Sequence, residues 1–207
     1  MQIYDLSMPI SELMPVYKNR EEKRPILEVI CNQKGKLYES KLSLPLHTGT
    51  HLDSPRHLFP QGPDISDFPL SQMIAPCQVL ELSHVKNAIG KEHLAEHNIQ
   101  EKTLLLKTRN SNVQGFDPNF VYLSAAGAAF LVEEGIICVG IDSLGIERNQ
   151  QYHATHKLLF EHNVWVLEGL RLKMVPEGTY LLVAAPLMLP EGEASPVRAL
   201  LVDFPRI

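Results

Sequence analysis

The segment His47-Thr-Gly-Thr-His-Leu-Asp-Ser-Pro-Arg-His57 gathers three of the chain's nine histidines and one aspartate into eleven residues. These four side chains stand at positions 47, 51, 53 and 57, which are all odd. Alternate side chains of an extended chain project to the same face, so an extended segment would direct all four to one side. Gly49 falls on that face too, where it would leave a space between His47 and His51 about the size of an ion.

A helix is the alternative, because His47 and His51 have the i, i+4 spacing of helical metal sites. Gly49, Pro55 and the β-branched threonines at positions 48 and 50 disfavour a helix. The glutamate of the helical protease motif is also absent after His47. We therefore predict an extended or irregular loop. Imidazole and carboxylate groups suit Zn²⁺ and related first-row ions, so the loop predicts a metal site rather than a histidine-rich polar turn.

Length and composition indicate one globular α/β domain over residues 1–207. Hydrophobic residues make up 44% of the chain and charged residues 21%, which is ordinary for a globular protein. The net charge of −5 offers no basic surface for nucleic acid. No apolar run is long enough to span a membrane, and the N-terminus lacks the features of a signal peptide. We therefore expect a cytoplasmic protein that binds neither nucleic acid nor membrane.

The three cysteines, Cys31, Cys77 and Cys138, are far apart, and no Cys-x-x-Cys pair occurs. This spacing suggests neither a zinc ribbon nor a dithiol redox site. Cys138 lies in the apolar run 136–139, so we predict a small buried hydrophobic residue rather than a nucleophile.

The hydrophobic pattern predicts more strands than helices. Strands are expected near the N-terminus and over residues 27–31, 41–46, 78–82, 103–108, 136–141, 164–167, 180–184 and 197–202. Helices are expected over residues 90–97, 124–134 and 152–162, with Ser124 as an N-cap and Gly135 as a stop. The prediction is a mixed, largely antiparallel sheet with helices, in which the unit at 103–141 has the order of a parallel strand–helix–strand element.

A loop that offers His47, His51 and Asp53 is one ligand short of a closed shell, or it leaves a position open for water. Asp142 and Glu168 end apolar strands, while His153 and His156 share one face of the predicted helix at 152–162. The two histidines alone are typical of a polar helix surface. Glu168 follows a buried run, and a buried carboxylate needs a partner, for which a metal ion is suitable.

The motif at 47–57 resembles the H-x-G-T-H-x-D-x-P-x-H signature of the cyclase family of metal-dependent hydrolases, which includes bacterial kynurenine formamidases and isatin hydrolases. The length is also similar to that of the formamidases. Further similarity lies in Asp5-Leu-Ser-x-Pro9, Lys107-Thr-Arg-Asn-Ser111, Gly140-Ile-Asp-Ser143, the pair His156 and Glu168, and Ser195-Pro-Val-Arg198.

The resemblance implies a fold similar to a swivelling β/β/α domain, a homodimer or higher homo-oligomer, and one or two Zn²⁺ or Mn²⁺ ions. His57 matches the family's catalytic acid/base, and His153 would be a neighbour of the metal, although its spacing also allows a ligand. The implied metal ligands are His47, His51, Asp53, which can bridge two ions, His156 and Glu168.

The chain departs from the formamidases near its N-terminus. Those enzymes carry an aromatic residue followed by Pro-Gly-Asp in the region that here reads Met14-Pro-Val-Tyr-Lys-Asn-Arg20, where Tyr17 is the nearest aromatic residue. That region helps to enclose the aryl substrate, so the metal chemistry carries over better than the substrate.

The leading hypothesis is a metal-dependent hydrolase of amide bonds in a small molecule, similar to an arylformamidase acting on N-formylkynurenine. The ion would activate a water molecule and polarise the carbonyl, while His57 moves the proton. The alternatives are hydrolysis of another cyclic amide or a lactone, a cyclase or dehydratase on the same site, and a non-catalytic metal- or ligand-binding protein. A pure binding protein would not need His57, so this histidine favours the enzyme.

Overall fold

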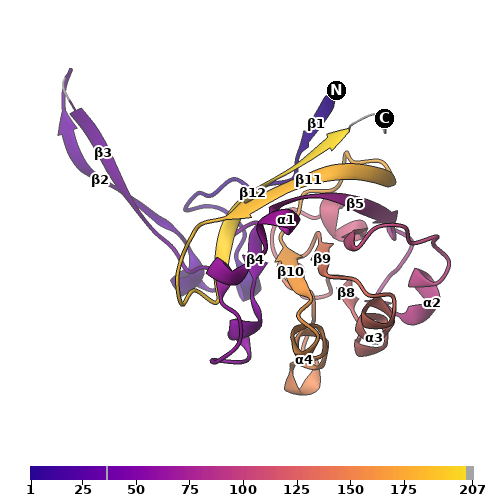
Figure 1. The fold of residues 1–207 in the computed structure, drawn as a ribbon. Helices are drawn as coiled ribbons and strands as arrows, with labels where there is room; N and C mark the ends of the chain where they lie inside the picture. The colour runs from indigo at the N-terminus through magenta and orange to yellow at the C-terminus, as the bar shows by residue number, and fades with distance from the viewer. Residues whose placement is uncertain (36, 204–207) are drawn as a thin grey trace.

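The computed structural model describes residues 1–35 and 37–203, and its centre is a sheet that closes on itself (Figure 1). The sheet order is β1-β12-β11-β5-β7-β9-β10-β4, and β4 also pairs with β12. Every strand of this sheet except β1 therefore belongs to a closed ring. The bounds are β1 Gln2–Asp5, β4 His51–Asp53, β5 Ile74–Glu81, β7 Thr103–Lys107, β9 Cys138–Ile141, β10 Trp165–Glu168, β11 Gly178–Pro186 and β12 Ala194–Asp203.

Strand directions in this sheet are mixed. Strands β5, β7, β9 and β10 run parallel to one another, and the remaining pairings of this sheet are antiparallel. The predicted mixed α/β fold is confirmed, as is the parallel pairing of β7 with β9. The ring closes because β12 is long: its first residues pair with β4, and its later residues pair with β11.

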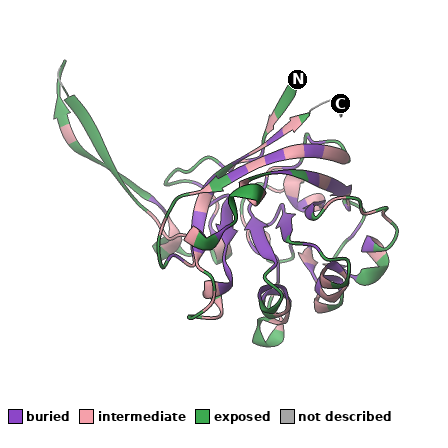
Figure 2. Ribbon diagram, viewed as in Figure 1, coloured by how far each residue is buried: buried purple, intermediate pink, exposed green. Residues whose placement is uncertain are grey.

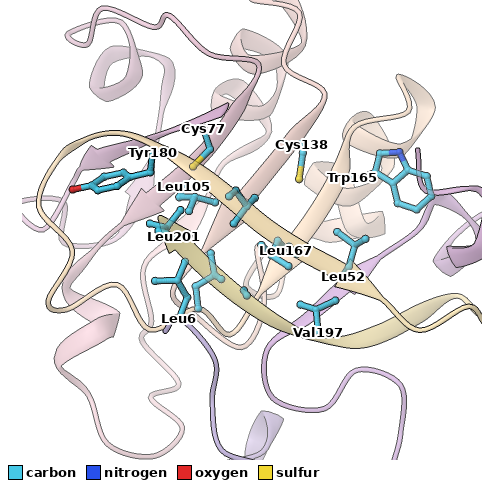
Figure 3. Packing of buried hydrophobic residues seen from close by; sticks show 14 of the residues in the cluster. Leu6, Leu52, Cys77, Leu105, Cys138, Trp165, Leu167, Tyr180, Val197 and Leu201 are labelled. Carbon is cyan, nitrogen blue, oxygen red and sulfur yellow. The ribbon is translucent and has the colours of Figure 1, made fainter. Parts of the chain in front are cut away.

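Alternating side chains divide the core into two clusters. Leu105 and Leu167 belong to a cluster to which every strand of the ring contributes, so this cluster fills the ring's interior (Figure 3). Their neighbours Leu104, Leu106 and Val166 face the opposite side, where they pack under the helices. Both clusters are almost free of solvent exposure, as the purple strands of Figure 2 show. The buried Cys77 and Cys138 belong to the interior cluster, as predicted for Cys138.

Four α-helices lie in the described part of the chain: α1 Leu70–Met73, α2 Lys91–Leu94, α3 Ala125–Glu133 and α4 Ala154–Glu161. Helix α3 agrees with its prediction, since the Ser124 hydroxyl accepts a hydrogen bond from the backbone N–H of Gly127 at 3.1 Å. The prediction for 90–97 was too long. Helix α4 begins at Ala154 rather than 152, because Tyr152 and His153 adopt left-handed φ angles of 57° and 53°. No helix in the described ranges is long and apolar enough to cross a membrane.

Short elements connect these parts. The 3₁₀ segments are η1 Tyr17–Asn19, η2 Glu21–Lys23, η3 Pro55–His57, η4 Ile65–Asp67, η5 Arg109–Asn112 and η6 Gln151–His153. The two-residue strands β6 Ala88–Ile89 and β8 Tyr122–Leu123 pair in parallel beside the main sheet.

A two-stranded hairpin, which we call the arm, projects far from the body (Figure 1). It consists of β2 Ile26–Gln33 and β3 Leu37–Ser43, which pair antiparallel. The first strand agrees with its prediction, whereas β3 starts and ends earlier than the predicted 41–46. Almost every described residue of the arm is exposed (Figure 2).

Candidate metal centre

The central strand of the motif, β4, lies between β10 and β12 in the closed sheet. Leu52 pairs in register with Leu167, and both side chains enter the interior cluster. Because strand side chains alternate, His51 and Asp53 project to the other side of the sheet. His51 pairs in register with Glu168, so these two side chains project to the same side. The prediction of an extended motif is confirmed for 51–53, but the chain then turns into η3.

Gly49 has a different role from the predicted one. A Cβ atom there would meet the Met14 side chain at 3.0 Å, and Met8 is next to it, so Gly49 leaves no space between the two imidazoles. The expected ion-sized gap at this residue is wrong. Gly49 instead lies against Gly169, where a Cβ atom would stand 2.2 Å from the Gly49 carbonyl oxygen. The Thr50 hydroxyl donates to the Gly169 carbonyl at 2.7 Å, which fixes the motif beside the end of β10.

The five side chains implied as metal ligands are brought together from three distant segments. Within the motif, His47 Nδ1 lies 2.8 Å and His51 Nε2 lies 3.3 Å from Asp53 Oδ1. His51 Nε2 is also 3.4 Å from Glu168 Oε2. Helix α4 supplies His156, whose Nε2 is 3.4 Å from Glu168 Oε1 and 3.8 Å from Asp53 Oδ2.

These atoms converge without satisfying one another. Within the described residues, the buried atoms His47 Nε2, His51 Nε2, Asp53 Oδ1 and His156 Nε2 have no hydrogen-bond partner. Each buried polar atom without a partner costs about 1–3 kcal/mol, so such a group of them needs a ligand. Nitrogen and carboxylate donors of this kind fit Zn²⁺ or Mn²⁺, and a cation would satisfy them together.

The five implied ligands form two overlapping groups that are each compact enough for one ion, and Glu147, His153 and His156 form a third such group beside them. His47, His51 and Asp53 make the first group, and Asp53, His156 and Glu168 make the second, with ligand atoms within 4.8 Å of one another. Asp53 belongs to both, and its two carboxylate oxygens face different histidines. The arrangement therefore offers two neighbouring ion positions that share one carboxylate.

The electrostatics of the centre favour added positive charge. Burial opposes protonation of His51, but the carboxylates of Asp53 and Glu168 outweigh it and raise its pKa to about 9. Burial likewise opposes a raised pKa for His156, yet the carboxylates around it raise that pKa well above its usual value. Against burial, the histidines lower the pKa of Asp53 well below its usual value and that of Glu168 to about 2. The same carboxylates would attract a bound cation.

His57 lies over the centre but outside both groups of donors. The turn of η3 follows Asp53 and places the His57 ring 4.3 Å from the ring of His47 and 5.7 Å from that of His156, between centroids. Burial lowers the pKa of His57 below its ordinary 6.5, so the imidazole is neutral at neutral pH. A neutral imidazole beside a metal centre can accept a proton.

Glu147 is a buried residue of the centre that sequence reasoning missed. Its carboxylate accepts hydrogen bonds from the backbone N–H groups of Thr155 and His156, both at 3.2 Å, at the start of α4. Glu147 Oε1 also lies 3.3 Å from His156 Nδ1, on the opposite side of the ring from Asp53. His153, the alternative ligand, contacts the same carboxylate at 2.5 Å. Glu147 stands in a loop without periodicity, so no sequence pattern marks it.

The position of Glu147 predicts a role in orienting His156. Carboxylates that hold the far nitrogen of a metal-binding histidine typically contribute about 10–100-fold to metal affinity. We expect Glu147→Gln, which keeps an oxygen for the backbone bonds, to weaken zinc binding by that factor in a chelator-competition titration. Glu161→Gln on the exposed side of the same helix is the control. Equal zinc affinity of both variants would show that Glu147 serves only the helix.

Asp142, another candidate from the sequence, is not part of the centre. Its carboxylate accepts hydrogen bonds from both the backbone N–H and the hydroxyl of Thr108, at 2.9 and 2.7 Å, and likewise from Ser111, at 3.1 and 2.6 Å. Burial outweighs these bonds and raises the pKa of Asp142 to about 6. The family motifs at 107–111 and 140–143 therefore meet in a structural network that ties β7 to β9.

A cavity of about 350 Å³ opens onto the centre. Tyr17 lines it together with His57, and its ring packs edge to face on Phe116 at 5.2 Å and Phe120 at 6.4 Å. The segment in which the chain departs from the formamidases thus forms one wall of the cavity. The volume of the cavity is sufficient for a small molecule with one aromatic ring.

Known proteins similar to this chain include hydrolases. The model of the Cyclase family matches residues 4–148. The kynurenine formamidase of Bacillus cytotoxicus is 32% identical over 179 residues, which cover 84% of this chain and 85% of that enzyme. A predicted metal-dependent hydrolase from Bacillus stearothermophilus has a TM-score of 0.89 at 45% identity, over 97% of each chain. Isatin hydrolase A from Labrenzia aggregata, bound to benzyl benzoate, has a TM-score of 0.85 at 25% identity, over 97% of this chain and 93% of its own.

Proposed function

Because this chain belongs to the Cyclase family, we propose that it is a metal-dependent hydrolase that cleaves non-peptide C–N bonds in small molecules. The observation that carries the proposal is the convergence of buried, unpaired nitrogen and carboxylate atoms on one cavity. His47, His51, Asp53, His156 and Glu168 would hold one or two Zn²⁺ or Mn²⁺ ions, with Asp53 shared between the two positions.

The chemistry follows from the positions of the side chains around the cavity. A divalent ion held by these residues would supply Lewis acidity, which polarises a carbonyl oxygen and lowers the pKa of water. The His57 imidazole, neutral and beside His47 and His156, accepts the proton of the attacking water and returns it to the leaving nitrogen. Glu147 keeps His156 directed at the centre, and the buried position of the carboxylates excludes bulk water from them.

The substrate that we propose is an aryl formamide, with N-formylkynurenine as the first compound to test. The kynurenine formamidase relative and the aromatic ring of Tyr17 in the wall of the cavity support this choice. Cyclic amides are the next candidate class, because isatin hydrolase A has a similar structure.

A substrate panel tests the proposal. Purified protein, loaded with zinc or manganese, is assayed against N-formylkynurenine, formanilide, isatin and a small lactone, with chelator-treated protein as the control. We expect metal-dependent hydrolysis of at least one amide and none by the chelated protein. Full metal occupancy without turnover of any amide would contradict the proposal and favour a cyclase, a dehydratase or a binding protein.

We also propose that the active form is a homo-oligomer in which a second copy covers the arm. An isolated two-stranded hairpin is marginally stable in water, yet this arm exposes large apolar side chains, with Ile30 60% and Tyr38 66% exposed. An apolar groove of about 740 Å³ at its base, lined by Leu42, Leu44 and Leu187 among others, adds to this surface. A second copy carries the same arm and the same groove, so one contact can be made twice.

Charging the arm should separate the copies. We expect light scattering to give at least twice the 23.3 kDa chain mass for the wild-type protein and the single-chain mass for the double variant Val29→Lys, Ile30→Glu. Both residues are exposed apolar side chains of the arm, so the pair replaces apolar surface with charged groups. Leu70→Lys, at an exposed apolar residue outside the arm, is the control. A monomeric wild-type protein would refute the proposal.

A further inference from the structure

Three cationic side chains line the cavity that opens onto the candidate metal centre: Lys18, Arg20 and Lys23. All three come from the short segment of η1 and η2, which lies where the chain departs from the formamidases. Lys18 and Arg20 are exposed and Lys23 is half-buried, whereas the carboxylates at the base of the cavity are buried. The cations therefore stand at the mouth of the cavity.

No carboxylate within the described ranges 1–35 and 37–203 forms an ion pair with any of these three groups. Lys18 and Lys23 instead place their ammonium groups 5.3 and 5.4 Å from the centroid of the Tyr17 ring. Contact with the aromatic ring holds these two lysines in position without neutralising them. Their charge thus remains available to a ligand in the cavity.

The backbone of this segment is held in an unusual conformation. Lys18 and Asn19 have successive left-handed φ angles of 57° and 51°, which are uncommon outside glycine. The ring of Tyr17 is packed on Phe116 and Phe120, so the body of the protein fixes the start of the turn. Such conformations persist where surrounding contacts impose them, and they concentrate at functional sites.

The charges in the cavity are separated in space. The chain as a whole carries a net charge of −5, and the base of the cavity contains the buried carboxylates of Asp53, Glu147 and Glu168. A metal ion at the base would offset these carboxylates, but it would not explain three unpaired cations at the mouth. An anionic ligand would explain these cations, because its charged end would interact with them while its other end reached the base of the cavity.

We propose that Lys18, Arg20 and Lys23 form an anion-binding subsite, so that the substrate carries a carboxylate or a similar anionic group away from the bond that is cleaved. This inference rests on the proposed hydrolase function and specifies the class of amide. The positive mouth attracts the anionic end, and the amide is thereby directed toward the metal centre and His57. A neutral amide of the same size lacks this interaction.

A matched pair of substrates tests the subsite. N-formyl-3-aminobenzoate and its methyl ester share the ring and the formamide, and they differ in the charge of one substituent. We expect the wild-type protein to hydrolyse the acid with a kcat/KM about 10-fold or more above that of the ester. This preference should fall as salt is added, because salt screens exposed charges. Equal values for the two substrates would contradict the proposal.

The triple variant Lys18→Gln, Arg20→Gln, Lys23→Gln should lose the preference, so that its kcat/KM for the acid falls to that for the ester, and circular dichroism shows whether it is folded. The control variant Lys86→Gln, Lys157→Gln, Lys173→Gln removes the same charge from exposed positions outside the cavity and should behave as the wild type. Loss of acid hydrolysis in both variants would attribute the effect to net charge and overturn the subsite.

A binding measurement keeps this test separate from the proposed hydrolase function. Calorimetry with 3-aminobenzoate, which has the carboxylate but no formamide, requires no turnover. We expect the zinc-loaded wild-type protein to bind it at least about 10-fold more tightly than the triple variant. Equal affinity would refute the subsite even if both amides are hydrolysed. Tighter wild-type binding in a protein that hydrolyses neither amide would support the subsite while the hydrolase proposal failed.

Discussion

Replacing Asp53 with alanine should remove both the metal and the activity. Asp53 belongs to both groups of donors, so its loss breaks both ion positions at once. Loss of His47 or His51 leaves the second group intact. We therefore expect Asp53→Ala to purify with almost no bound metal, and its hydrolysis to approach the uncatalysed rate, a decrease of about 10⁶-fold or more. Metal content per chain after gentle purification measures the first effect directly.

Asp53 is buried, so the experiment must separate loss of metal from loss of the fold. Circular dichroism and the metal content of Asp203→Ala, at an exposed aspartate, serve as controls. A folded Asp53→Ala protein that retained its full metal content would contradict the shared-carboxylate arrangement.

Replacing His57 with alanine should leave the metal in place and reduce turnover by about 10²–10⁴-fold, the usual contribution of a general acid–base group. His57 touches the rings of His47 and His156 but belongs to neither group of donors. Burial places its pKa below 6.5, so the wild-type rate should fall as the pH decreases through that pKa and the imidazole becomes protonated. The variant should lack this acidic limb.

The outcome for His57→Ala separates three roles, with His84→Ala as the control at an exposed histidine. Retained metal with slow turnover supports proton transfer. Loss of metal in step with activity would make His57 a ligand and His153 the next candidate for the base. Retained metal with full activity would make His57 a polar loop residue.

The sequence predicted the fold well where local patterns decide it. Apolar runs identified β5, β7 and the strands from β9 to β12, and Ser124 with Gly135 bounded α3, because these signals act within a few residues. The sequence pattern placed the start of α4 two residues early. The left-handed φ angles of Tyr152 and His153 depend on tertiary contacts around Glu147, which the pattern does not contain. The closure of the ring by β12 and β4 joins residues far apart in the chain, which no local pattern specifies.

The candidate centre was predicted through its chemistry and less well through its geometry. The alternation of residues 51–53 correctly placed His51 and Asp53 on one face, and the family resemblance selected His156 and Glu168 over Asp142. The role of Gly49 was misjudged, because the close approach of Gly169 cannot be read from the sequence. Glu147 and the cations at the mouth were missed for the same reason: the fold alone brings them to the cavity.

The most direct test of the account is a metal titration of activity. Protein stripped with a chelator is mixed with increasing zinc or manganese, and hydrolysis of the best substrate from the panel is followed at each step. We expect no activity without metal and a linear rise that ends at one or two ions per chain, with no activity at any metal concentration for Asp53→Ala. Full activity of the stripped protein, or the same rise with Asp53→Ala, would contradict the central claim that hydrolysis takes place at this metal centre.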